Sequence, residues 1–364
     1  MLQAAACMSE DGKRSGASSE QGGGQRSVSW REQGGGEGLK SSPGVGKGAG
    51  LEAAFFGGTF TGLPEPVQRD LLACVGELKR AGVLCRVRVS THPLEVSERQ
   101  LHLLAEYGVD TVELGIQSFS DRALAVSGRG YDGDTGERAC RAVLDAGFEL
   151  VVQLMAFLPE ATEDDDVASA RRTGAVGPHA LRVFPTVVVA GTQLHRWWLD
   201  GTYRPATVPE ACERVARMIE ASVAGAGSGR VPALLRIGLQ HGEWEEGAVA
   251  AGPHHPALGE LALSVLLSRS LARGADRCGS AVVDVRLDAG LSSLMTGHGR
   301  FGLRDLEARL PGRRVRLTVL RRRGSGPTAR RGSGRREVFA CDRFRVEQRD
   351  GSLLVEPNRE RLAA

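Results

Sequence analysis

The stretch Ala53-Ala54-Phe55-Phe56-Gly57-Gly58-Thr59-Phe60-Thr61-Gly62 decides the fold of this chain. Its apolar run stops at two glycines and a threonine, which is the pattern of a buried parallel strand that opens into a turn at its carboxyl end. Paired glycines let a ligand approach the backbone closely and leave N–H groups free to bind it. The plainer alternative is an ordinary turn after a strand, so the interpretation depends on the motifs further along the chain.

Strand patterns alternate with helical patterns from this stretch onward. Strands are predicted at 53–57, 85–90, 111–116, 150–157, 180–184 and 234–237, and helices at 65–81, 97–107, 121–125, 134–146, 163–173 and 209–224. Because each parallel crossover needs a helix of this length, the repeated units imply a parallel sheet. A full eight-unit barrel needs ~250 residues, more than the repeated units span here. We therefore expect an α/β fold, a partial (β/α)6 TIM-like barrel.

The composition divides the chain into three parts. Residues 1–50 are rich in Gly, Ser and Gln and show no period, so they are predicted to be a disordered segment. Residues 51–240 form the partial barrel. Residues 241–364 are predicted to be a small α+β extension, with a loop at 241–251, a helix at 257–272, strands at 281–287 and 315–320, a helix at 303–310, a hairpin at 345–355 and a flexible basic loop at 322–334.

Charge and cysteine content indicate the compartment of the protein and the kind of partner it binds. The seven cysteines are odd in number and widely spaced, which fits reduced cytosolic thiols better than a disulfide framework. No basic n-region precedes Cys7, and the apolar run at 150–158 is too short to span a bilayer, so we expect a cytoplasmic protein without a membrane segment. Residues 301–364 hold 17 arginines against 8 acidic residues, which indicates a polyanionic partner or a general arginine bias.

Polar groups follow several of the predicted strands. They are Ser90-Thr91-His92, Gln117-Ser118, Gln153 with Met155, and Arg182 with Pro185. Sites in parallel sheets lie at the carboxyl ends of the strands, so these groups are expected to converge at one edge.

Three motifs in this order resemble a known family. They are the opening Phe55-Phe56-Gly57-Gly58-Thr59 segment, Gly115-Ile116-Gln117-Ser118-Phe119 and Ser127-Gly128-Arg129-Gly130. Their order and spacing resemble radical S-adenosylmethionine (SAM) enzymes, in the branch of the Elongator catalytic subunit and of relatives of the oxygen-independent coproporphyrinogen oxidase. The resemblance covers roughly residues 51–320 and implies a barrel that lacks its first unit.

The resemblance also implies cofactors, a reaction and a site. The family binds SAM and a 4Fe-4S cluster, cleaves SAM reductively, and in this branch modifies tRNA, so SAM and tRNA or another RNA are the expected partners. The cofactor-binding positions carried over to this chain are Gly57, Gly58, Thr59, Ser90, Gln117, Arg129 and Gln153. Gly57 and Gly58 would hold the methionyl amino group, and the last three would face the ribose and carboxylate.

Several of these positions have a plainer interpretation or depart from the family. Arg129 could be a surface arginine, and Gln153 a hydrogen-bonded core glutamine. Where Ser90 stands the family often has an acidic residue, and the adenine-side Gly-Leu-Pro-Gly is replaced by Phe157-Leu158-Pro159-Glu160.

The cluster loop of the family is missing from this sequence. Three thiolates in a CxxxCxxC loop hold the cluster in the family, and thiolates suit iron–sulfur ligation. Here Cys7 alone precedes the Gly-Gly segment, so no metal ligand and no catalytic residue is assigned. We expect an N-terminus that differs from the ancestral one, through a wrong start, a frameshift or degeneration, and a first strand with an unpaired edge.

Three further short motifs give weaker indications of function. Gly299-Arg300-Phe301-Gly302 resembles the GxxG loop of KH-type RNA-binding domains, which makes Gly299, Arg300 and Gly302 candidate RNA contacts, with an ordinary tight loop as the alternative. His254-His255 is predicted to lie in a loop without a metal. Asp164-Asp165-Asp166 is predicted to be a solvated helix start.

Three functions therefore stay open. The first is a radical SAM enzyme, which as written lacks its cluster ligands and so could be truncated or inactive. The second is a non-catalytic SAM- or RNA-binding protein. The third is an unrelated partial barrel that uses other residues at the strand ends, such as His92.

Overall fold

The computed structural model describes residues 51–239, 247–279, 281–320, 336–349 and 352–358. The predictions for residues 1–50, for the basic loop at 322–334 and for the 241–246 part of the predicted loop lie outside the described residues.

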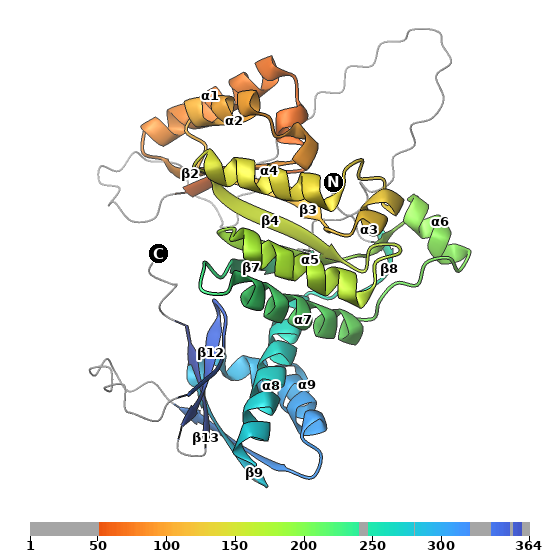
Figure 1. The fold of residues 1–364 in the computed structure, drawn as a ribbon, viewed down its shortest axis with the longest axis vertical. Helices are drawn as coiled ribbons and strands as arrows, with labels where there is room; N and C mark the ends of the chain where they lie inside the picture. Colours follow the sequence, from red (N-terminus) through yellow and green to blue (C-terminus); the bar gives the residue numbers. More distant parts are fainter. Residues whose placement is uncertain (1–50, 240–246, 280, 321–335, 350–351, 359–364) are drawn as a thin grey trace, which may run out of the picture.

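A six-stranded, wholly parallel sheet forms the N-terminal part of the fold (Figure 1). The order across the sheet is β1-β2-β3-β4-β5-β7, with β1 (Leu51–Phe55), β2 (Leu84–Thr91), β3 (Thr111–Gln117), β4 (Glu149–Ala156), β5 (Ala180–Pro185) and β7 (Ala233–Ile237). This confirms the predicted α/β partial barrel.

Helices cover one face of this sheet. They are α1 (Glu65–Arg80), α2 (Glu98–Glu106), α3 (Asp121–Val126), α4 (Gly133–Asp145), α5 (Glu163–Val176) and α7 (Val208–Ala226), with short 3-10 turns η1 (Phe60–Gly62) and η2 (Pro93–Glu95). Figure 1 shows α4, α5 and α7 side by side on the sheet. Every residue of β3 is buried, as expected for a central strand of a parallel sheet.

Capping residues mark the starts of several of these helices, within one residue of the predicted positions. Asp132 caps α4 by accepting a hydrogen bond from the Thr135 N–H at 2.7 Å. Thr162 and Thr207 each form a capping box with the acidic residue three positions on. These caps satisfy backbone N–H groups that the first helical turn leaves without partners.

Helices α5 and α7 cross at glycine contacts. A Cβ atom on Gly174 would lie 2.0 Å from the Ser222 carbonyl oxygen, and one on Gly225 would lie 2.0 Å from the Arg171 carbonyl oxygen. Only glycine permits backbones to approach this closely, so the two helices are locked in one register.

The two edges of the sheet differ. Among the described residues β1 pairs with β2 alone, and Leu51 on it is 64% exposed. At the other edge the Leu234 N–H of β7 donates to Asp342 Oδ2 at 2.7 Å, and Arg343 donates to the Leu234 carbonyl oxygen. These two side chains cover the backbone groups through which a further strand could pair.

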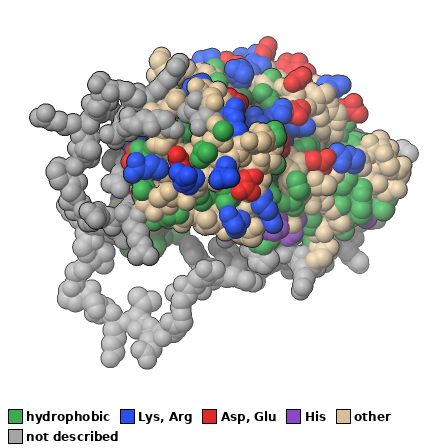
Figure 2. Space-filling view, turned by 90° about the horizontal axis from the view of Figure 1, so that it is seen from below, with side chains coloured by type: hydrophobic (Ala, Val, Ile, Leu, Met, Phe, Trp, Pro, Cys, Tyr) green, Lys and Arg blue, Asp and Glu red, His purple; other side chains and the backbone are tan. Residues whose placement is uncertain are grey.

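The C-terminal part is built on a five-stranded mixed sheet of order β10-β9-β13-β12-β11. Its elements are α8 (Leu258–Cys278), β9 (Val282–Asp288), η3 (Ala289–Leu291), α9 (Ser292–Arg309), β10 (Arg314–Leu320), β11 (Arg336–Ala340), β12 (Phe344–Arg349) and β13 (Ser352–Pro357). The predicted hairpin is confirmed, because β12 and β13 pair antiparallel. Figure 2 views the molecule from this end and shows basic side chains with acidic ones among them.

The predicted loop at 241–251 is wrong at its end. Val249–Ala251 forms strand β8, which pairs antiparallel with β6 (Val188–Val189). The short helix α6 (Gln193–Leu199) follows β6 in the chain. Three residues are too few to show an alternating pattern, so the sequence gives no strand signal there.

Helix α9 contains the GxxG-like segment. The helix is interrupted by a kink at 297–300, where His298, Gly299 and Arg300 all have positive φ. Gly299 and Arg300 are exposed, whereas Gly302 is buried and a Cβ there would lie 2.1 Å from the Leu294 carbonyl oxygen. Close packing between the two halves of the helix therefore accounts for Gly302, and the RNA role of Gly299 and Arg300 stays a prediction.

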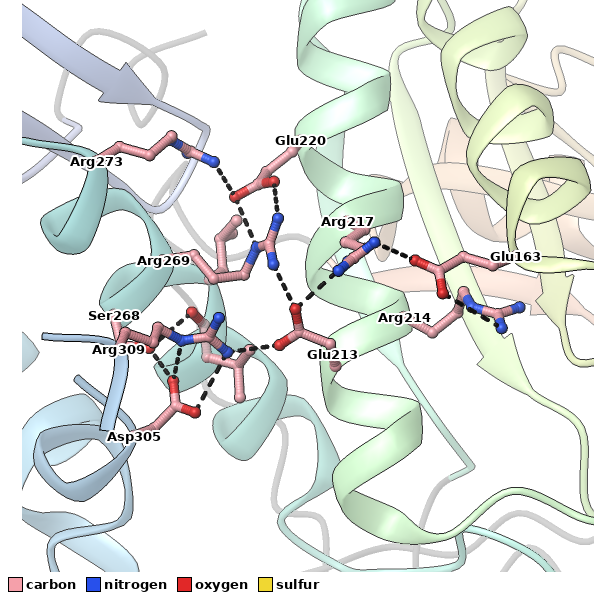
Figure 3. A network of polar contacts seen from close by, with 12 residues as sticks. Glu163, Glu213, Arg214, Arg217, Glu220, Ser268, Arg269, Arg273, Asp305 and Arg309 are labelled. Atoms are coloured by element: carbon pink, nitrogen blue, oxygen red, sulfur yellow. Dashed lines mark hydrogen bonds and ion pairs between the residues drawn. The ribbon is translucent and has the colours of Figure 1, made fainter. Parts of the chain in front are cut away.

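A network of ion pairs joins the two parts of the molecule (Figure 3). Glu213 on α7 contacts Arg309 of α9 at 2.6 Å and Arg217 of its own helix at 3.4 Å, and it also pairs with Arg269 of α8. Arg269 reaches on to Glu220 at 2.9 Å. Each acid therefore holds more than one arginine, an arrangement that fixes α8 and α9 against the barrel.

We expect Glu213→Gln to lower the free energy of unfolding by about 1–2 kcal/mol, because three guanidinium groups lose their shared, partly buried carboxylate. Urea unfolding measures the effect, and Glu77→Gln, an exposed position on α1, is the matched control. Equal loss in both variants would show that the network adds nothing to stability.

Candidate functional site

The Gly-Gly turn comes directly after β1. Gly57 has φ of 98°, a conformation that side chains with a Cβ rarely adopt, and both glycines are exposed. The turn is held from behind, because the Thr61 and Thr91 hydroxyls share a hydrogen bond and Gln68 Nε2 donates to the Thr61 carbonyl oxygen at 3.0 Å. The backbone of Gly57 and Gly58 is therefore open, and Thr61 just after it is fixed in place.

Thr59 and Ser90 lie near this turn in different roles. The Thr59 side chain faces Gly62 inside the turn, where a Cβ on Gly62 would lie 3.1 Å from the Thr59 methyl group. Ser90 is 1% exposed and lies beside Glu113 in the β2–β3 register. Thr59 therefore lies within the turn itself, whereas Ser90 supports the carboxyl edge of the sheet from the interior.

The structure brings Gln117, Arg129 and Gln153 together at the ends of β3 and β4. Gln153 Nε2 donates to Gln117 Oε1 at 3.1 Å, and Arg129 Nη2 donates to the Gly115 carbonyl oxygen at 3.0 Å. A Cβ on Gly115 would lie 2.6 Å from Gln117 Nε2, so a side chain there would displace the end of Gln117. Gln117 itself has φ of 62°.

Two polar atoms of this cluster are buried without a partner in the described part of the chain. They are Gln153 Oε1 and Arg129 Nε. A buried polar atom that makes no hydrogen bond carries a desolvation penalty of about 1–3 kcal/mol, which a bound ligand can relieve. The plainer interpretation of Gln153 as a satisfied core glutamine therefore holds for its nitrogen and not for its oxygen.

Tyr131 and His92 extend the cluster. The Tyr131 hydroxyl donates to the carbonyl oxygens of Gly115 and Ile116 at 3.1 and 2.7 Å, and its ring meets that of His92 edge-on at 5.0 Å. His92 Nδ1 accepts a hydrogen bond from the Leu94 N–H. Burial, assisted by the nearby Arg129 charge, lowers the pKa of His92 to about 4, so the ring is neutral at pH 7.

A charged layer lies deeper on the same face of the sheet. Glu113 on β3 is fully buried, accepts a hydrogen bond from Arg182 at 2.6 Å, and lies 3.9 Å from Arg88. Phe56 covers this layer, because both guanidinium groups lie 5.4 Å from its ring centroid. Arg182, which the sequence predicted among the polar groups at the strand ends, is thus paired with the buried carboxylate of Glu113.

The predicted solvated helix start is wrong for Asp166. Asp164 is exposed and Asp165 closes the capping box of α5, but Asp166 is 1% exposed and pairs with Arg214 at 2.5 Å. Asp166 is the fourth residue of α5 and is buried against α7, which supplies the cation Arg214.

Comparison with known proteins agrees with this geometry. The Radical SAM superfamily model matches residues 45–172, and the Radical_SAM C-terminal domain model matches residues 178–265, together more than half of the chain. The chain belongs to the radical SAM superfamily.

Individual relatives are similar over part of their length. Elongator complex protein 3 of Homo sapiens is 26% identical over 217 residues, which are 58% of this chain and 36% of that protein. The tRNA uridine(34) acetyltransferase of Dehalococcoides mccartyi is 29% identical over 121 residues, 32% of this chain and 26% of that enzyme. The match therefore covers little more than a third of the first relative and about a quarter of the second.

A solved structure shares the fold of the chain. The archaeal Methanocaldococcus infernus Elp3 with an N-terminal deletion (1–46) superposes with a TM-score of 0.53 at 22% identity, covering 60% of this chain and 54% of that one. At this identity the likeness supports the half-barrel architecture.

The residues at the strand ends fit SAM. Exposed glycine backbone, two amide side chains and a guanidinium group are donors and acceptors suited to the amino, carboxylate and ribose groups of that cofactor. The fit rests on the two buried atoms that lack partners, Gln153 Oε1 and Arg129 Nε.

The described residues do not fit a 4Fe-4S cluster. No group of three or more His, Cys, Asp or Glu side chains able to hold a metal ion occurs among them. Cys74 and Cys85 are exposed on α1 and β2, and burial raises the thiol pKa of both Cys140 and Cys212 to about 12. Separately, no helix in the described ranges is long and apolar enough to cross a membrane.

Sequence reasoning missed Glu113, Tyr131 and Asp166. Glu113 is a charged residue inside an otherwise apolar strand pattern, and such a residue predicts a buried partner. No comparable signal marks Tyr131 or Asp166, since their partners lie on other elements.

We expect the free energy of unfolding to fall by about 1–2 kcal/mol between pH 6.5 and pH 4 because of His92. The unfolded histidine takes up its proton near pH 6.5, whereas the folded one does so near pH 4, so acid favours the unfolded chain in that window. Urea unfolding across this range measures it. His92→Gln should flatten this part of the curve, the exposed His102→Gln should not, and parallel curves for all three proteins would contradict the assignment.

Proposed function

We propose that this chain binds S-adenosylmethionine at the carboxyl edge of its half-barrel and acts on tRNA or a related RNA. The observation that carries the proposal is the pair of buried, unpartnered polar atoms, Gln153 Oε1 and Arg129 Nε, at the strand ends that also carry exposed Gly57 and Gly58. The superfamily match supports SAM as the ligand.

Each residue has a defined task in this proposal. The open backbone at Gly57-Gly58 receives the methionyl amino group, and Arg129, held by Gly115 and Tyr131, faces the carboxylate. Gln153 and Gln117 orient each other and leave acceptor capacity for ribose hydroxyls. Neutral His92 adds no further positive charge beside Arg129, which favours a sulfonium ligand.

SAM cleavage is outside what the described residues support. In the family a 4Fe-4S cluster supplies the electron for reductive cleavage, and the described cysteines do not fit one. We therefore assign SAM binding to this chain and derive no redox step from it.

The RNA part of the proposal is supported by the relatives. Several curated relatives are named tRNA uridine(34) acetyltransferases, which makes tRNA the substrate class to test first. Exposed Arg300, Arg304 and Arg314 on the C-terminal part could contact phosphates, whereas Arg316 is paired with Asp284. Acidic side chains lie among the basic ones in Figure 2, so this surface does not form a uniformly positive patch.

We expect Gly58→Ala to weaken SAM binding at least tenfold while leaving the melting temperature unchanged. A Cβ on Gly58 meets nothing within 4 Å, so the fold accepts it, but the methyl group obstructs approach to the backbone. Isothermal titration with SAM measures the affinity. Gly76→Ala, in helix α1 and without a positive φ, is the control for glycine replacement and should leave affinity unchanged; equal affinity in the wild type and Gly58→Ala would argue against the site.

Anaerobic reconstitution with iron and sulfide separates binding from redox chemistry. We expect the polypeptide to take up SAM without iron, because the described residues offer no cluster site. About four irons per chain would show that ligands elsewhere in the polypeptide rebuild a cluster. Absence of both iron and SAM binding would overturn the proposed site, although the chain would keep the superfamily fold.

A further inference from the structure

A cavity of about 480 Å³ lies where the last strand of the barrel meets the C-terminal part. It is lined by β7, by the start of α8, by η3 with the start of α9, and by the turn between β11 and β12. Ligand sites commonly have volumes of roughly 300–1,000 Å³ and often lie where two parts of a chain meet. The residues that line this cavity are separate from those of the proposed SAM site.

The walls of the cavity are largely apolar. They are formed by Leu235 and Ile237 of β7, Leu263 of α8, Leu291 of η3 and Leu294 of α9. Leu235 is 44% exposed, although the residue before it on the strand is buried. Exposed apolar surface at a cavity that also has polar groups indicates a ligand with an apolar face and a polar edge.

One carboxylate in the wall is fixed in place. Glu260, in the first turn of α8, accepts a hydrogen bond from His298 Nε2 at 3.0 Å, and Ser293 also hydrogen-bonds it. These two donors hold the pKa of Glu260 below its usual range, so the group is ionised at neutral pH. A carboxylate has about four lone-pair sites, so Glu260 can accept further hydrogen bonds from a ligand in the cavity.

The other charged groups of the β11–β12 turn are engaged with the strand beside them. Asp342 Oδ2 accepts from the Leu234 N–H at 2.7 Å, and Arg343 donates to the Leu234 carbonyl oxygen. Both residues therefore form the floor of the cavity against β7. Glu260 is the charged group in the opposite wall, and it is held by side chains alone.

His298 links this carboxylate to an exposed turn with a disfavoured backbone. His298, Gly299 and Arg300 have φ of 47°, 66° and 63°, in a region that is costly for the two residues with a Cβ. All three residues are exposed, and the His298 ring lies 6.4 Å from the ring of His255. The contact with Glu260 therefore fixes the turn next to the cavity and places the cation Arg300 two residues away from that contact.

Among the four RNA bases, this arrangement is complementary to guanine. Guanine presents two neighbouring donors, N1–H and N2–H2, on its Watson–Crick edge, and a carboxylate can accept such a pair with both oxygens. Adenine and cytosine place an acceptor beside the amino group, and uracil has one N–H between two carbonyl groups, so each of them sets an acceptor against the carboxylate. The apolar walls suit the faces of an unstacked base, which is the form in which proteins read RNA sequence.

We propose that this cavity receives one unstacked guanine of a bound RNA, with Glu260 accepting from its N1–H and N2–H2 groups and Arg300 contacting a neighbouring phosphate. The inference rests on the RNA part of the proposed function, and it adds where the RNA is read and which base is preferred. Leu235 contacts the face of the base, whereas His298 and Ser293 are positioning residues that orient the carboxylate.

Base preference is the measurement that tests the role of Glu260. Three fluorescein-labelled uridine octamers, with guanosine, adenosine or uridine as the fourth nucleotide, are titrated with the full chain and followed by anisotropy. We expect the guanosine octamer to bind about tenfold tighter than the other two. Glu260→Gln keeps the size of the side chain and replaces one acceptor by a donor, so the preference should fall to about twofold or less.

Glu307→Gln is the matched control for the loss of a carboxylate. Glu307 is exposed on α9 and does not line the cavity, so this variant should keep the full guanine preference. Equal binding of the three octamers by the wild type would overturn the inference. A full preference in folded Glu260→Gln would also overturn it.

Arg300→Gln separates the phosphate contact from base reading. It should weaken all three octamers by the same factor, about threefold at 0.1 M salt, and lower the slope of log affinity against log salt by about one. The guanine preference should stay. A preference lost in this variant would contradict the assignment of Arg300 to a phosphate.

Leu235→Trp tests the cavity itself and keeps the inference testable if Glu260→Gln does not fold. The larger ring occupies space at the wall, so the guanosine octamer should bind at least tenfold more weakly. Val83→Trp is the control, because Val83 is 48% exposed in the turn between α1 and β2 and is not part of the cavity. Equal affinity of the wild type and folded Leu235→Trp for this octamer would overturn the proposal.

Two further titrations separate the sources of a guanine and the two proposed sites. Free GMP should displace the guanosine octamer only at much higher concentration, since it lacks the flanking phosphates; displacement at equal concentration would overturn RNA as the source of the base. If the wild type binds SAM and none of the octamers, the RNA part of the proposed function and this inference both fail. If it binds the octamers with the guanine preference and does not bind SAM, this inference holds and the SAM site fails.

Discussion

The burial of one carboxylate at the centre of the parallel sheet is the constraint on which the half-barrel depends. Glu113 is fully buried, and burial raises its pKa although Arg182 and Arg88 oppose the shift. A buried charge stays only when it is paired, and removing one partner of such a pair is strongly destabilising. Arg88 also reaches Glu52 at 3.2 Å, so the chain of charges joins β1, β2, β3 and β5 across one face. The helix-covered face is held by apolar packing instead. One face of the sheet therefore forms the hydrophobic core, and the other carries the charged layer.

The alternation of side chains along β3 links this structural layer to the ligand site. Residues 113, 115 and 117 lie on one face, and Val112, Leu114 and Ile116 on the other, where the helices pack. This two-residue period places Glu113 among its arginines, and a register shift between Gly115 and Gln117, where Gln117 has a positive φ, precedes the strand end. Gly115 between them leaves room for Gln117 and gives its carbonyl oxygen to Arg129 and Tyr131. A shift of register by one residue would destroy the charged layer and the site together.

Much of this architecture could be predicted because it depends on local sequence periods. The strands, the crossover helices and the Gly-Gly turn arise from patterns within about ten residues, and no observed bound of the predicted barrel elements differs from its predicted position by more than three residues. What could not be predicted depends on distant partners. Glu113 and Arg182 are 69 positions apart, and Arg214 is 48 positions from Asp166. The solvated interpretation of Asp166 failed for that reason, since only the packing of α7 against α5 brings a cation to it.

Binding of the ligand and electron transfer to it require different chemical groups. Binding of a nucleoside and an amino acid group needs amides, a guanidinium group and open backbone, all of which come from β1, β3 and β4 and the loops after them. Electron transfer needs thiolates, whose ligand geometry is independent of those strands. In the proposed site, the affinity for SAM would therefore depend on hydrogen bonding and desolvation at Arg129 and Gln153. For this reason the proposal of SAM as the ligand rests on these unpartnered atoms together with the superfamily match, and not on the cysteine count.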